Sequence, residues 1–73
     1  MFHNPCSDQV FIDVKERLES IIVYDQLGRV VINKNYTTYQ VQEQLNISNL
    51  NKGIYFVEVK TSGGKSKETL IKD

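Results

Sequence analysis

The chain has 73 residues, which is enough for one small domain, because a chain this short buries only about 60% of the surface that it exposes when unfolded. Its 40% hydrophobic and 25% charged residues lie in the globular range and argue against a disordered, collagen-like or transmembrane protein. Nine basic residues balance nine acidic ones, so no net field attracts nucleic acid or an anionic membrane. We therefore predict no nucleic-acid partner and no membrane span.

The N-terminal segment carries no export signal. A secretory signal has a basic region followed by an apolar one, whereas residues 1–9 read MFHNPCSDQ. No apolar run approaches the roughly 18 residues of a membrane span. If the chain is exported, its N-terminal export signal therefore lies elsewhere. The single cysteine, Cys6, cannot form an internal disulfide, so stability has to come from the core.

The first half of the chain predicts a strand followed by a β-hairpin. Val10, Ile12 and Val14 fall on one face of an extended segment, because side chains alternate along a strand. The runs IIVY at 21–24 and VVI at 30–32 are rich in β-branched residues, which favour strands. The joining sequence DQLG has Asp and Gly at the outer positions of a type I turn. A hairpin over 21–32 is expected.

The second half predicts further strands. Apolar residues alternate with polar ones at 39–41 and at 45–47, and the run IYFVEV at 54–59 is the strongest strand signal in the chain. Leu70 and Ile71 belong to the last strand. Gly63-Gly64 lies between the last two strands and supplies the positive φ angles of a two-residue hairpin loop.

Two registers are open for this last hairpin. A two-residue loop places Lys60 opposite Lys67, and like charges directly across a sheet repel each other. A bulged loop that pairs Lys60 with Glu68 avoids this repulsion. The sequence leaves both registers possible.

These segments predict an all-β fold of six or seven short strands, arranged as a β-sandwich or a small barrel. We expect the core to draw apolar side chains from most of the strands. The expected core residues are Val10, Ile12, Ile22, Val31, Leu45, Ile47, Tyr55, Val57 and Leu70.

No pattern in the sequence points to catalysis, a cofactor or a bound metal. His3 and Cys6 lie three apart in a segment interrupted by Pro5, where their side chains tend to point in opposite directions. The acidic residues lack the spacing of a calcium loop. Gly64-Lys65-Ser66 lacks the upstream glycine and the following helix of a phosphate-binding loop. We predict a non-enzymatic protein without cofactor.

Four features occur in order along the chain. They are Asn4-Pro5, YDQLGRVV at 24–31, LNISNLNKGIYFV at 45–57, and a lysine-rich end through LIK at 70–72. Together they resemble the type A C-terminal sorting domain of the type IX secretion system of Bacteroidetes. The resemblance extends from Asn4 to Lys72 and depends on the ordered set, because a single piece such as Gly-Ile-Tyr is not specific.

The resemblance implies a seven-stranded, immunoglobulin-like antiparallel β-sandwich at the end of an unrelated cargo protein. Residues 1–3 are then a start or linker from the upstream cargo, and 4–73 are the sorting domain. The partners are the outer-membrane translocon, which reads the domain, and a cell-surface sortase, which removes it from the secreted or surface-attached cargo. The positions that match the family pattern are Asn4, Pro5, Asp25, Gly28, Gly53, Tyr55 and Lys72.

A second function fits the same strand pattern. An immunoglobulin-like or fibronectin-like adhesive or carbohydrate-binding module has a similar strand count, and a fold does not fix a function. Tyr24, Tyr36, Tyr39 and Tyr55 are candidates for a sugar-binding face, although tyrosines on strands more often serve as core or cross-strand partners. An exposed, planar row of these rings favours this alternative.

Overall fold

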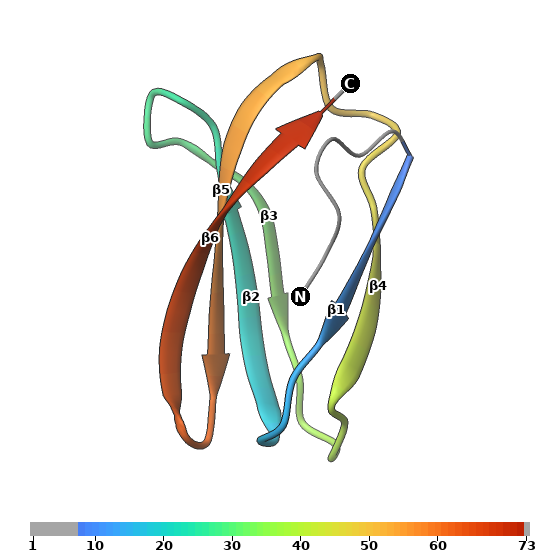
Figure 1. Cartoon of the computed structure of the whole chain (residues 1–73), viewed down its shortest axis with the longest axis vertical. Coiled ribbons are helices and arrows are strands. Elements are labelled where there is room, and N and C mark those ends of the chain that lie inside the picture. The colour runs from blue at the N-terminus through green and yellow to red at the C-terminus, as the bar shows by residue number, and fades with distance from the viewer. Residues whose placement is uncertain (1–7, 73) are drawn as a thin grey trace.

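The structure is a computed structural model that describes residues 8–72, and within that range it contains six strands and no helix (Figure 1). The strands are β1 Gln9–Asp13, β2 Leu18–Tyr24, β3 Val30–Asn35, β4 Gln42–Asn46, β5 Gly53–Thr61 and β6 Gly64–Lys72. The all-β expectation is confirmed. The described residues have one strand fewer than the expected seven-stranded sandwich.

The strands form two antiparallel sheets, one of four strands in the order β3-β2-β5-β6 and one of two strands, β1 and β4. Both sheets contribute side chains to one core. The segment 36–41, which includes the strand expected at 39–41, is not a strand. It connects the larger sheet to the smaller one, and the carbonyls of Gln40 and Val41 accept hydrogen bonds from the amides of Leu18 and Val14, both at 2.8 Å. Two of its backbone carbonyls thus have hydrogen-bond partners although the segment belongs to neither sheet.

The core draws buried apolar side chains from β1, β2, β4, β5 and β6, and from Ile47 just after β4. Its members are Val10, Ile12, Leu18, Ile21, Val23, Leu45, Ile47, Tyr55, Val57, Val59 and Leu70. Seven of the nine expected core residues are confirmed, and two are wrong. Ile22 is only half-buried because Ile21 and Val23 point inward from β2, and Val31 is 38% exposed because Ile32 packs against the core instead.

The hairpin of β2 and β3 is confirmed. Val23 pairs with Ile32 and Tyr24 with Val30, so the register shifts by one residue just before the turn. Within the turn itself, Gly28 adopts a φ of +82°, a left-handed conformation that residues with a Cβ rarely adopt.

Both registers expected for the last hairpin are wrong. Lys60 pairs with Lys65, not with Lys67 or Glu68. The loop residues are Ser62 and Gly63, and Gly64 follows them with a φ of +136°, so the turn lies one residue earlier than the Gly-Gly pair suggests. Lys67 faces Glu58 in this register, a favourable pair of opposite charges on neighbouring strands.

Candidate functional site

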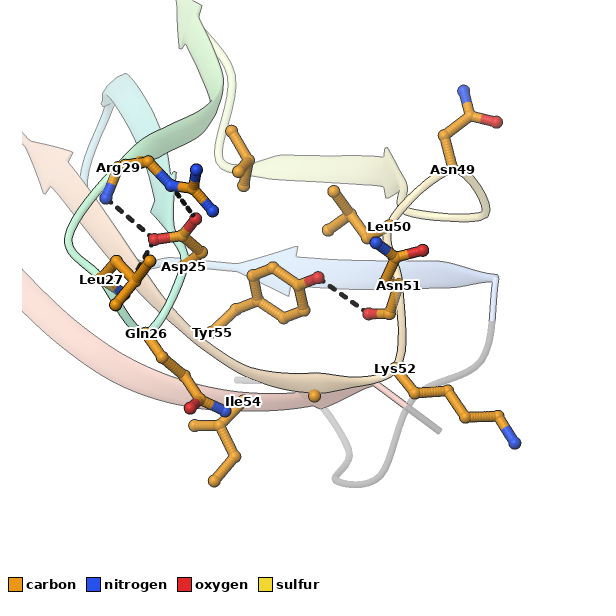
Figure 2. A pocket seen from close by; sticks show the side chains of 12 residues that line it. Asp25, Gln26, Leu27, Arg29, Asn49, Leu50, Asn51, Lys52, Ile54 and Tyr55 are labelled. Atoms are coloured by element: carbon orange, nitrogen blue, oxygen red, sulfur yellow. Dashed lines mark hydrogen bonds and ion pairs between the residues drawn. The ribbon is translucent and has the colours of Figure 1, made fainter.

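A hollow of about 330 Å³ lies at one end of the sandwich, between the β2–β3 turn and the connection that leads from β4 to β5. Figure 2 shows the turn on one side, the connection on the other, and the ring of Tyr55 between them. The lining combines apolar side chains with amides and charged groups.

The β2–β3 turn is shaped by Asp25. One of its carboxylate oxygens, Oδ1, accepts hydrogen bonds from the backbone amides of Leu27 and Arg29, both at 2.9 Å. The other, Oδ2, lies 2.7 Å from Nε of Arg29. The hydrogen bond from the Arg29 amide, helped by the Arg29 guanidinium and the Leu27 amide, holds the pKa of Asp25 below its ordinary value. The amide of Gly28 donates to the Asp25 carbonyl at 3.1 Å and closes the turn.

The opposite wall is the β4–β5 connection, which Tyr55 holds in place. Tyr55 is only 8% exposed, and its hydroxyl donates a hydrogen bond of 2.8 Å to the backbone carbonyl of Asn51. The Leu50 amide donates to the Ile47 carbonyl at 3.0 Å, which makes a turn at the start of the connection. Oδ1 of Asn46 accepts from both the amide and the hydroxyl of Ser48. These local bonds give the connection a defined shape without regular secondary structure.

Gly53 marks the place where the two walls approach each other. A Cβ at this position would lie 3.8 Å from the side-chain nitrogen of Gln26, a residue of the turn. Gly53 is also the register partner of Lys72 at the end of β6. The end of β6 therefore lies at the same end of the molecule as the hollow. Figure 1 shows that β6 ends on the side of the molecule where the β2–β3 turn lies.

The structure brings together five of the seven positions that match the family pattern. Asp25, Gly53 and Tyr55 line the hollow, Gly28 lies in the same turn as Asp25, and Lys72 pairs with Gly53. The remaining two, Asn4 and Pro5, lie outside the described residues, as do His3 and Cys6.

Sequence reasoning missed most of the residues that complete the hollow. Gln26, Leu27, Leu50, Asn51 and Ile54 all line it, yet none carries a catalytic or binding pattern. The available signal was their position, because each lies next to, or within a few residues of, a position that matches the family pattern.

The four tyrosines do not form one exposed row. Tyr55 is buried, Tyr36 packs against the core, and Tyr24 pairs with Phe56 on the outer face of the four-stranded sheet. Tyr39, which is 74% exposed, lies in the segment between β3 and β4. The four rings therefore do not form the exposed, planar row that would favour a sugar-binding face.

One pair of ionisable groups lies away from the hollow. Burial raises the pKa of the Tyr36 hydroxyl, and the nearby carboxylate of Glu43 raises it further. The hydroxyl in turn lowers the pKa of Glu43. Glu43 lies on β4 and Tyr36 directly follows β3, and neither residue lines the hollow.

Residues 8–72 contain neither a metal-type cluster of side chains nor a helix suited to a membrane. No three His, Cys, Asp or Glu residues converge as they do at a metal site. No helix in this range has the length and apolar character needed to cross a membrane.

Comparisons with known proteins address the family directly. No curated protein matches the chain. A solved structure, described as the CBM51-2 and INT domains from Clostridium perfringens ZmpB, superposes with a TM-score of 0.65 at 19% sequence identity. The match covers 94% of this chain but 16% of that one, and it supports the fold alone. The family model described as "Secretion system C-terminal sorting domain" matches residues 1–73. The chain therefore belongs to the C-terminal sorting domains of the type IX secretion system, which mark proteins for secretion or for attachment to the cell surface.

Proposed function

We propose that this domain directs an attached cargo through the outer-membrane translocon of the type IX system, without catalysis, and that the translocon reads the end of the sandwich that carries the hollow. One observation supports this choice of surface above the others. Positions of the family pattern that lie far apart in the sequence, from Asp25 to Lys72, meet at this end.

The chemistry of these positions suits recognition by shape. Asp25 and Gly28 build the turn, and Tyr55 fixes the connection through the carbonyl of Asn51. None of the groups provides an activated nucleophile or an acid–base pair aimed at a common point. Together these hydrogen bonds give the recess a defined outline, and a defined surface is what a docking partner recognises.

The same proposal assigns roles to the two ends of the domain. Asn4 and Pro5 belong to the entry from the cargo, where a surface sortase separates cargo and domain. Lys72 belongs to the surface that is read. No metal, cofactor or nucleic acid takes part.

A reporter protein tests the proposal. It carries an N-terminal signal peptide and this chain at its C-terminus, and it is expressed in a Bacteroidetes strain with an intact type IX system. We expect the reporter in the medium or on the cell surface, and mass spectrometry should find it without the domain.

Two controls make this experiment specific. The same reporter without the domain should stay in the periplasm, and so should the full fusion in a strain that lacks the translocon. If the full fusion stays periplasmic in a strain that exports its own cargo normally, the proposal is wrong and the adhesive module becomes the leading function.

A further inference from the structure

Part of the exposed apolar surface of residues 8–72 lies at the hollow. Of the seven large hydrophobic residues that are exposed in the described chain, Leu27, Val31 and Ile54 line the hollow. Val30 adjoins Val31 on β3, and Ile71 is the register partner of Ile54. The other two, at positions 11 and 39, lie on β1 and on the β3–β4 connection. Clustered exposed apolar groups usually mark a contact surface.

One basic residue lies on each wall of the hollow, Arg29 on the β2–β3 turn and Lys52 on the β4–β5 connection (Figure 2). Lys52 is exposed and forms no ion pair with residues 8–72. Within the same range, Arg29 contacts the Asp25 carboxylate through Nε, its side chain is 73% exposed, and the two terminal nitrogens of its guanidinium have no assigned partner. These two nitrogens have the geometry that binds a second carboxylate in a bidentate manner. Asp25 is the one acidic residue in the lining, and its oxygens are already bonded to Arg29 and to backbone amides.

From this combination we infer that the hollow accepts an acidic protein segment, in which an apolar side chain enters the recess and flanking carboxylates bind Arg29 and Lys52. This inference rests on the proposed function, because it specifies the partner surface for the same site. A protein segment fits better than an anionic membrane. Membrane recognition typically uses about four to eight clustered basic residues, whereas the lining holds two, one of which already has an acidic partner.

Charge reversal tests the cationic part of the inference in the reporter assay. Lys52→Glu should lower export about tenfold or more, because it opposes like charges across the contact, while Lys52→Arg should retain export. Lys15→Glu is the matched control, an exposed lysine in the β1–β2 connection at the other end of the sandwich. It should export normally.

A second pair of variants tests the apolar part. Leu27→Ser removes a side chain that is 78% exposed at the hollow, and Phe11→Ser removes one that is 62% exposed on β1. Both variants should stay folded by circular dichroism, since surface changes alter stability by about 0.5 kcal/mol or less. Export should fall for Leu27→Ser alone.

The outcomes separate this inference from the proposed function. If the intact domain fails to export the reporter, the proposed function itself is wrong. If the intact domain exports the reporter but Lys52→Glu lowers export no more than Lys15→Glu does, the inferred acidic partner is wrong. It is also wrong if Leu27→Ser lowers export no more than Phe11→Ser does.

A direct binding measurement distinguishes a membrane from a protein. The ¹⁵N-labelled chain is titrated with vesicles of equal parts phosphatidylglycerol and phosphatidylcholine. We expect the amide signals of Leu27 and Lys52 to stay unchanged, whereas broadening confined to the hollow would overturn the assignment to a protein partner.

Discussion

Removing the hydroxyl of Tyr55 tests the structure of the candidate site most specifically, because it deletes one hydrogen bond of the β4–β5 connection. Tyr55→Phe removes the 2.8 Å hydrogen bond to the Asn51 carbonyl and leaves the ring, which is 8% exposed, in its place. A net contribution of about 1 kcal/mol is typical of such a bond. Because Asn51 is exposed, water can bond its carbonyl in the variant, so the loss should not exceed this value by much.

Urea unfolding followed by circular dichroism measures this loss. For a domain of this size about 1 kcal/mol corresponds to a fall in Tm of roughly 4–8 °C. Tyr39→Phe is the control, since its ring is 74% exposed, and it should change stability by about 0.5 kcal/mol or less. Equal stability of Tyr55→Phe and the parent chain would refute the proposed anchoring of the connection. If export is lost while stability is unchanged, the hydroxyl is read directly by the partner.

Three further predictions concern the fold. Leu70→Ala should destabilise by about 2–5 kcal/mol because Leu70 is fully buried, whereas Ile71→Ala next to it, 42% exposed, should cost far less; similar urea midpoints for both would contradict the assigned face of β6. Gly63→Ala places a Cβ 2.7 Å from Cγ of Glu16 and should lower the Tm, and the added change Glu16→Ala should restore much of the loss; no restoration would exclude this contact as the cause. The pKa of Asp25 is lower in the folded state, so the stability that the ionised carboxylate contributes is complete above the ordinary carboxyl pKa and is lost as pH falls through the folded pKa. Urea midpoints measured from about pH 7 to about pH 2 should therefore fall less steeply in Asp25→Asn than in the parent chain. Parallel curves would refute the lowered pKa of Asp25.

Local turn chemistry explains what the sequence could predict. Asp25 and Gly28 define their turn through contacts within five residues, so the hairpin around them was correct. The inward face of β2 was not predictable in the same way. Ile21, Ile22 and Val23 are consecutive apolar residues, and a run without alternation does not indicate which face is buried.

The register expected for the last hairpin was wrong for a related reason. Gly63 and Gly64 can both serve in a turn, and moving the loop by one residue shifts every pair by two. Such a shift keeps each side chain on its face, so Leu70 points into the core, as expected, and lies opposite Tyr55.

The hollow was beyond sequence reasoning because it is a tertiary feature. Its walls come mainly from the turn at 25–29 and the connection at 49–52, and no local rule states that these approach each other. The family pattern marked positions in both segments, but only the pairing of β2 with β5 places Asp25 near Tyr55. The same pairing brings residues between those positions, such as Leu27 and Lys52, to the hollow.

Site-specific photocrosslinking tests most directly whether the translocon reads this end of the domain. A photoreactive phenylalanine derivative replaces Leu27 at the hollow or, as the control, Phe11 on β1; both positions are exposed, so the domain should stay folded. Reporter fusions are irradiated in cells during export, and crosslinked products are identified by mass spectrometry. The proposed site predicts crosslinks to translocon subunits from position 27 and not from position 11. Crosslinks from position 11 alone would contradict it and assign recognition to the smaller sheet.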